Sequence, residues 1–274
     1  MNWMKKMAVA LVCLLPLGAQ AARVDTIQVK SPSMNKNIEV VVVSPDVSHA
    51  KACPVVYLLH GYSGDARTWV GTKPNLPEIA DEKGMFFVCP DGENSWYWDS
   101  PMHKDMRYET FISKELISYI DAHYKTVANR TGRAITGLSM GGHGAMWNAI
   151  RHSDVFSVAG STSGGVDIRP FPKNWERSVQ LGEKDKYPEN WDNYTVMSLV
   201  PTLKKGQIAM IFDCGEDDFF LQVNKKYHEA LLKQGIEHDF ITRPGAHTHT
   251  YWNNSIDFQI LFFQKQFQKM GSLK

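Results

Sequence analysis

Short apolar runs alternate along the chain with segments of helical periodicity. The apolar runs are bounded by glycine, proline or aspartate, as expected for buried strands, and lie at 38–43, 54–59, 85–89, 133–136, 156–159, 207–212 and 238–242. The segments with one apolar helical face lie at 76–83, 111–124, 143–150, 219–233 and 253–268. Such alternation predicts an α/β fold with a mostly parallel sheet and helices on both faces. Ligands bind such sheets beyond the carboxyl ends of the strands.

One stretch, residues 163–205, interrupts this alternation. It has little periodicity, several glycines and prolines, and five aromatic residues, namely Phe171, Trp175, Tyr187, Trp191 and Tyr194. A long irregular insert in a compact domain is typically a functional lid or pocket wall, whereas a plain surface excursion is the alternative. The aromatic residues favour the lid.

The N-terminal residues have the pattern of a secretory signal peptide. Lys5 and Lys6 precede an apolar stretch from residue 7 to 17, and Ala19-Gln20-Ala21 offers a cleavage site. The apolar stretch is too short for a stable membrane span. We therefore expect residues 1–21 to be removed, residues 22–274 to form a single catalytic domain, and the protein to be secreted or periplasmic without a stable membrane anchor.

Charge and cysteine content exclude some classes of function. The 274 residues include 30 basic and 29 acidic side chains without a basic block, so the chain has no electrostatic footprint for nucleic acid.

Residues 22–274 keep three cysteines, Cys53, Cys89 and Cys214, each at or near the end of an apolar run. At most one internal disulfide can form, and buried, non-catalytic thiols are expected. Composition says nothing about oligomeric state.

The residues around Ser139 have the pattern of a nucleophile elbow. The run Gly137-Leu138-Ser139-Met140-Gly141-Gly142 is a G-x-S-x-G motif between a predicted strand and a predicted helix. In an α/β-hydrolase the serine occupies a strained turn there, and the glycines leave room for the neighbouring strand and helix. Ser139 is therefore the expected nucleophile.

A serine hydroxyl needs a base, and the base needs an acid to orient it. In this fold the chain order is serine, acid, histidine. His247 and His249 both follow the last predicted strand, and His247 is favoured because it lies closer to the strand end. Sequence suggests no third ligand for a metal shared by this pair, so no metal or cofactor is expected. For the acid, Asp217 and Asp218 both follow the turn at Gly215, and the pattern alone does not separate them.

Two backbone amides are expected to form an oxyanion hole. The amide of Met140 directly follows the nucleophile, and the amide of Tyr62 lies in the loop after an earlier strand. In that loop His60 is expected to be structural or to line the site. Trp96 and Trp98 either stack on a sugar or cinnamoyl group or pack in the core. His60, Trp96 and Trp98 are thus the candidates for substrate contact.

Four motifs together resemble one family. Residues 58–64 (LLHGYSG), 137–142, 214–218 (CGEDD) and Gly245-Ala246-His247 with Tyr251-Trp252 are similar to the esterase D-like α/β-hydrolases. That group includes S-formylglutathione hydrolases, tributyrin esterases, feruloyl and acetyl xylan esterases and mycolyltransferases. The resemblance implies that Asp218 is the acid and His247 the base. His249 stands where tributyrin esterase-type members often carry tryptophan.

These observations favour a secreted serine carboxylesterase acting on small-molecule or oligosaccharide esters, with acetyl or feruloyl esters of plant polysaccharides as candidates. An S-formylglutathione-type thioesterase and an acyltransferase are the alternative enzymes. A non-catalytic carbohydrate-binding protein on a hydrolase scaffold is the alternative of a different class. Retention of candidates for all three triad positions favours an enzyme.

Overall fold

The computed structural model describes residues 22–273, so the predicted signal peptide lies outside the described residues. Within 22–273 no helix is long and apolar enough to cross a membrane. The core of the structure is one eight-stranded sheet with the order β1-β2-β4-β3-β5-β6-β7-β8. Its strands are β1 (Arg23–Ser31), β2 (Lys36–Ser44), β3 (Val55–Leu59), β4 (Phe86–Pro90), β5 (Arg133–Gly137), β6 (Val158–Thr162), β7 (Ala209–Gly215) and β8 (Asp239–Arg243).

The sheet is mostly parallel, as predicted. The six strands from β4 to β8 in the sheet order are parallel, and only the β1–β2 hairpin and the β2–β4 pair are antiparallel. All seven predicted strands are present. β1 is an additional strand that the apolar pattern does not predict, because most of its side chains are exposed or half-buried. It pairs along its whole length with β2 at one edge of the sheet.

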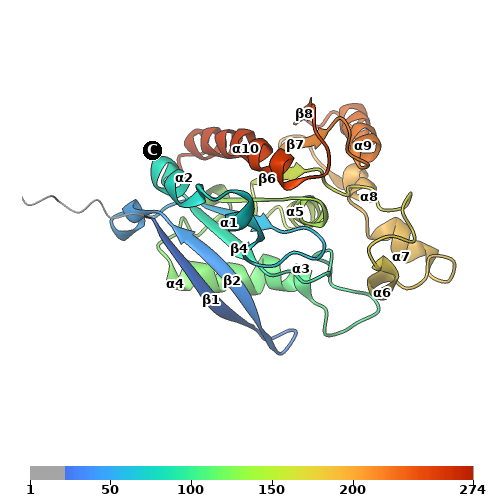
Figure 1. Ribbon diagram of the computed structural model, residues 1–274, viewed down its shortest axis with the longest axis horizontal. Helices are drawn as coiled ribbons and strands as arrows, with labels where there is room; N and C mark the ends of the chain where they lie inside the picture. Colours follow the sequence, from blue (N-terminus) through green and yellow to red (C-terminus); the bar gives the residue numbers. More distant parts are fainter. Residues whose placement is uncertain (1–21, 274) are drawn as a thin grey trace, which may run out of the picture.

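Helices cover both faces of the sheet (Figure 1). The longer helices are α2 (Leu76–Lys83), α4 (Leu116–His123), α5 (Met140–Arg151), α9 (Leu221–Lys233) and α10 (His249–Lys269). The shorter ones are α1 (Thr68–Thr72), α3 (Tyr108–Thr110), α6 (Arg177–Leu181), α7 (Pro188–Asn193) and α8 (Val196–Leu199). Single turns lie at η1 (Asp46–His49), η3 (Arg130–Gly132) and η4 (Val200–Thr202), and a π-helical turn, η2 (Phe111–Glu115), joins α3 to α4.

Alternation along the strands divides the apolar side chains between two cores. Val40 and Val42 of β2 face a core that includes residues of α4, α5 and α9, whereas Val41 and Val43 face a core that includes residues of α1, α2 and α10. β3 and β5 are buried along their whole length. The nucleophile motif at the end of β5 is therefore attached to the interior of the sheet.

The insert (residues 163–205) contains the short helices α6, α7 and α8, although its sequence has little periodicity. It projects at one end of the molecule (Figure 1). Trp191 is buried against the main core, and its indole N–H donates to the carbonyl of Gly182. Arg177 is buried among aromatic rings and donates to the carbonyl of Phe171. Burial lowers the pKa of the Arg177 guanidinium.

Two glycines allow the elbow to pack tightly. A Cβ on Gly141 would lie 2.2 Å from the carbonyl oxygen of Leu59, and a Cβ on Gly137 would lie 2.4 Å from the carbonyl carbon of Gly141. Both contacts are with backbone atoms, which cannot rotate away as a side chain can. The first turn of α5 thus lies directly against the end of β3.

We expect Gly141→Ala to lower the free energy of unfolding by about 3 kcal/mol, because overpacking against backbone forces β3 and α5 apart. Urea unfolding followed by circular dichroism measures this change. Gly71→Ala is the matched control: a Cβ there meets no atom within 4 Å, and alanine favours the helix α1. If the two variants unfold at the same urea concentration, the close approach at Gly141 does not limit stability.

Candidate active site

Ser139 lies in the turn between β5 and α5, in the backbone conformation expected of a nucleophile elbow. Its φ of 56° and ψ of −116° are strained for a residue with a side chain. Its amide donates to the carbonyl of Thr162 at 3.0 Å, which ties the elbow to the end of β6. Ser139 is 8 % exposed, so it is nearly buried.

His247 and Asp218 complete a chain of hydrogen bonds that begins at Ser139. His247 Nε2 lies 2.9 Å from Ser139 Oγ, and Nδ1 lies 2.8 Å from Asp218 Oδ2. With Nδ1–H donating to the carboxylate, Nε2 is free to accept the hydroxyl proton of the serine. The Asp218 side chain is completely buried, and its Oδ1 accepts a hydrogen bond from the amide of Phe220 at 2.8 Å. Three segments distant in sequence thus meet at the carboxyl edge of the sheet.

The structure separates the alternatives that the sequence pattern left open. Asp217 is exposed, and the contact recorded for it is a backbone one, from its amide to the carbonyl of Gly245. His249 is also exposed and lies at the first position of α10, where its Nδ1 is 2.7 Å from the hydroxyl of Thr72. Asp218, not Asp217, therefore contacts His247, and His247, not His249, contacts Ser139.

Aromatic rings surround His247. Phe219 packs on it with 4.3 Å between ring centroids, and Trp252 meets it edge-on at 4.9 Å. Phe219 follows Asp218 directly and Trp252 lies in the first turns of α10, so the elements that carry the acid and the base also supply these rings. Phe219 belongs to none of the motifs that predict the site. Its position directly after Asp218 is the feature of the sequence that could have indicated its place beside the site.

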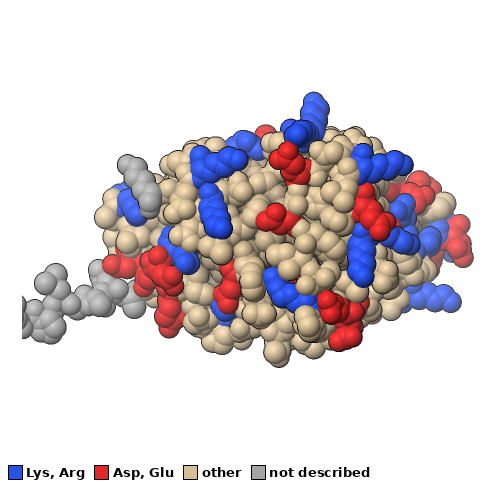
Figure 2. Space-filling view, turned by 90° about the horizontal axis from the view of Figure 1, so that it is seen from above, with Lys and Arg blue, Asp and Glu red and all other residues tan. Residues whose placement is uncertain are grey.

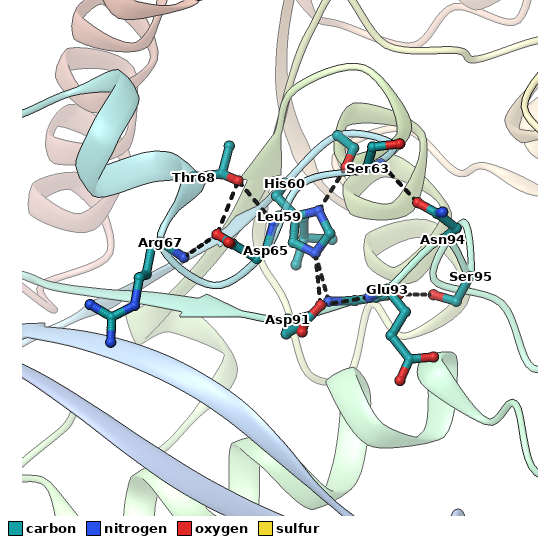
Figure 3. Close-up of polar contacts among 12 residues, drawn as sticks. Leu59, His60, Ser63, Asp65, Arg67, Thr68, Asp91, Glu93, Asn94 and Ser95 are labelled. Atoms are coloured by element: carbon teal, nitrogen blue, oxygen red, sulfur yellow. Dashed lines mark hydrogen bonds and ion pairs between the residues drawn. The ribbon is translucent and has the colours of Figure 1, made fainter.

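The amides of Tyr62 and Met140 both lie beside the nucleophile, in the loop after β3 and at the start of α5. Within residues 22–273 the amide of Tyr62 donates to no acceptor, and Met140 is the first residue of α5, where an amide has no acceptor within the helix. Figure 3 shows how the first loop is supported: the amide of Ser63 donates to Asn94 Oδ1 at 2.8 Å, which connects it to the loop after β4. The two amides are therefore free to donate to a ligand, as an oxyanion hole requires.

His60 has a structural position rather than the substrate contact that was one expectation for it. The ring is 1 % exposed and lies beneath the loop (Figure 3). The amide of Gly92 donates to its Nε2 at 2.7 Å, so Nδ1 carries the proton and donates to the carbonyl of Gly61, also at 2.7 Å. His60 thus joins the loops after β3 and β4.

Trp96 and Trp98 also lie in the core, so their expected stacking on substrate is corrected by the structure. They are 1 % and 0 % exposed and stack on each other at 5.7 Å. Both meet the ring of His143 edge-on, and burial lowers the pKa of His143 to about 3, so this imidazole is neutral. The packing alternative for the two tryptophans therefore holds.

A cavity of about 440 Å³ opens over Ser139. It is lined by residues from the loop after β3, the elbow, the insert, the acid turn and the start of α10: Gly61, Tyr62, Ser63, Gly64, Thr68, Leu138, Ser139, Trp175, Phe219, His247, His249 and Trp252. Its volume is in the range of small-molecule sites. Trp175 is the residue of the insert that reaches it, so the insert forms one wall of the cavity.

The chain is similar to known esterases in both sequence and structure. Residues 31–263 match the protein family described as "Putative esterase". An acetyl esterase from Caldicellulosiruptor saccharolyticus is 28% identical over 215 residues, which cover 73% of this chain and 79% of that protein. S-formylglutathione hydrolase from Mus musculus is 26% identical over 199 residues, covering 65% and 68%. The structure of a ferulic acid esterase superposes with a TM-score of 0.78 at 27% identity, over 90% of this chain and 99% of that chain. These similarities confirm the predicted α/β-hydrolase fold.

Proposed function

The chain belongs to the esterase family, in the esterase D-like group, and is a serine carboxylic ester hydrolase, so we propose that Ser139, His247 and Asp218 form its catalytic triad. The observation that carries this proposal is the unbroken chain of hydrogen bonds from Ser139 Oγ through both ring nitrogens of His247 to Asp218. A serine whose proton can be accepted in this way is an activated nucleophile.

In the proposed reaction Ser139 Oγ attacks the ester carbonyl while His247 Nε2 accepts its proton. Asp218 holds the imidazole in the tautomer required and stabilises the imidazolium that forms. The amides of Tyr62 and Met140 donate to the oxyanion, and each such donor contributes about 3 kcal/mol in related sites. His247 then protonates the leaving alcohol, and water, activated by the same histidine, hydrolyses the acyl-enzyme.

The proposed substrates are acetyl or feruloyl esters of plant polysaccharides or oligosaccharides. Two kinds of relative support this class, since one is named an acetyl esterase and another a ferulic acid esterase. The cavity adds support, because Trp175, Phe219 and Trp252 offer apolar faces to an acyl group or a sugar ring. Thioester hydrolysis is the second candidate, favoured by the similarity to an S-formylglutathione hydrolase. The proposal that the enzyme is exported rests on the sequence of residues 1–21.

The test is a panel of acetyl, butyryl, feruloyl and S-formylglutathione substrates, assayed on the exported protein, whose N-terminus is expected to be Ala22. We expect the acetyl and feruloyl oxygen esters to be hydrolysed with kcat/KM at least about tenfold above that of the thioester. A fluorophosphonate probe should label one residue per chain, Ser139, as identified by peptide mass. A preference for the thioester would favour the second candidate, and diversion of the acyl group to an added sugar would indicate a transferase. Failure to label would favour the non-catalytic binding protein.

A further inference from the structure

An exposed carboxylate, Glu176, lies next to two residues of the cavity lining, beside the proposed oxyanion loop. Glu176 accepts a hydrogen bond from the hydroxyl of Tyr62 at 3.0 Å, and both Tyr62 and the neighbouring Trp175 line the cavity. Within residues 22–273 no lysine, arginine or histidine forms an ion pair with Glu176. Burial and the adjacent carboxylate raise the pKa of the Tyr62 hydroxyl. The hydrogen-bond partner of the Glu176 carboxylate is thus the neutral hydroxyl of Tyr62.

The turn that carries Glu176 is held in place from below. Trp175 and Glu176 have φ angles of 54° and 47°, in the left-handed region that is costly for residues with side chains. Trp175 stacks on Phe219, and the buried guanidinium of Arg177 lies 4.9 Å from the Trp175 ring centroid. These contacts fix the strained turn. They also keep the positive charge of Arg177 in the core, where Trp96 and Trp191 lie within 5.6 Å of it.

Two cations of the neighbouring elements, Lys73 and Arg67, are paired with carboxylates outside the cavity. Lys73 Nζ lies 2.7 Å from Asp257 of α10. Arg67 lies 3.5 Å from Glu39 of β2, and Figure 3 shows its guanidinium pointing away from the loop after β3. In the part of the chain from 22 to 273, the lining of the cavity includes no lysine or arginine. The lining itself therefore supplies no fixed positive charge.

A second carboxylate, Asp65, belongs to the loop after β3, next to the cavity residue Thr68. Asp65 is exposed, and it accepts hydrogen bonds from the amide of Arg67 at 2.8 Å and from the hydroxyl of Thr68 at 3.4 Å. Thr68 itself lines the cavity. Both donors are neutral, so Asp65 adds to the negative potential that Glu176 creates. Figure 2 shows acidic and basic side chains interspersed over the face that it displays.

We propose that Glu176 selects substrates by charge, so that the cavity accepts neutral and cationic esters and disfavours esters that carry a carboxylate in either half. This inference rests on the proposed esterase function and narrows its substrate class. It predicts that acetylated or feruloylated neutral sugars are better substrates than thioesters of glutathione, which is an anionic peptide at neutral pH. Because Glu176 is exposed beside the cavity, its effect on a charged ester acts through space and is strongest at low ionic strength.

The test compares matched pairs of esters at low ionic strength. The anionic pairs are 4-acetoxybenzoate against its methyl ester, and 4-nitrophenyl hydrogen succinate against 4-nitrophenyl methyl succinate. The cationic pair is acetylcholine against 3,3-dimethylbutyl acetate. In Glu176→Gln, which keeps an acceptor for Tyr62, we expect kcat/KM to rise about three- to tenfold for at least one anionic ester and to fall similarly for acetylcholine. The neutral esters should change less than twofold, and Glu176→Lys should enlarge the shifts.

The control is Glu189→Gln, which removes the same charge from another exposed position of the insert. Unlike Glu176, Glu189 forms no hydrogen bond or ion pair with a residue of the cavity lining within residues 22–273. It should leave every ratio unchanged, and 1 M NaCl should reduce the charge discrimination of the unmodified enzyme. A merely structural role for Glu176 would change all substrates in one direction and so overturn the proposal, as would unchanged ratios for both anionic pairs. These outcomes are distinct from failure of the esterase function, in which the neutral esters themselves are not hydrolysed.

Discussion

Replacement of Ser139 by alanine is expected to lower kcat for a neutral acetyl ester by about 10⁴- to 10⁶-fold. The variant keeps the cavity and the proposed oxyanion donors but has no oxygen to accept the acyl group. Any turnover that remains must use a water molecule in place of the covalent step. Assays with 4-nitrophenyl acetate measure the loss of the acyl-enzyme as a missing burst phase. They measure the loss in kcat as a lower steady-state rate.

Ser63→Ala is the control for this change. Ser63 lines the same cavity and has a positive φ, as Ser139 does, but lies in the loop after β3 and is remote from His247 in the chain. It should retain kcat within about tenfold, because no proton transfer is assigned to its hydroxyl. If Ser139→Ala kept its burst, or if Ser63→Ala lost it, the nucleophile would have to be reassigned.

Asp218→Asn is expected to lower kcat by about 10⁴-fold, with little change in KM. The asparagine amide can donate to His247 Nδ1, which places the imidazole proton on Nε2. That nitrogen then cannot accept the proton of Ser139, although all three side chains remain in position. Thermal unfolding should show a folded variant, so that the loss is one of chemistry and not of structure.

Asp217→Asn tests the same prediction from the neighbouring position. The exposed carboxylate of Asp217 has no part in the hydrogen-bond chain, and its removal should change kcat less than about twofold. Equal losses in the two variants would mean that the acid turn responds to charge in general. A loss confined to Asp217→Asn would show that Asp217, and not Asp218, is the acid of the triad.

The fold was largely predictable from the sequence, for reasons that particular elements make clear. The apolar runs at β3, β4 and β7 are buried on both faces, and such strands stand out from their surroundings. Helix α2 has its predicted bounds because Gly84 ends it in the left-handed conformation. β1 was missed because an exposed edge strand lacks a continuous apolar run, and its pairing with β2 is seen only in the folded chain.

The residues of the candidate site could be predicted where the chemistry requires a fixed sequence motif. They could not be predicted where their role depends only on how the folded chain places them. Gly137 and Gly141 identify Ser139, because no other residue permits the backbone contacts found there. Trp96 and Trp98 were ambiguous, since an indole looks the same in a sequence whether it packs in the core or contacts a ligand. Glu176 could not be found at all, because its position depends on a strained turn and on a tyrosine more than a hundred residues away.

The proposed triad draws its members from regions of unequal local stability. Ser139 follows β5, which is buried and lies between two strands, whereas His247 follows β8, a half-exposed strand with a neighbour on one side only. Edge elements open more often than central ones. On heating, the histidine loop is therefore expected to detach while the sheet beneath the serine is still intact. The temperature limit of the enzyme would then be set by the fraying of one edge strand, below the melting point of the domain.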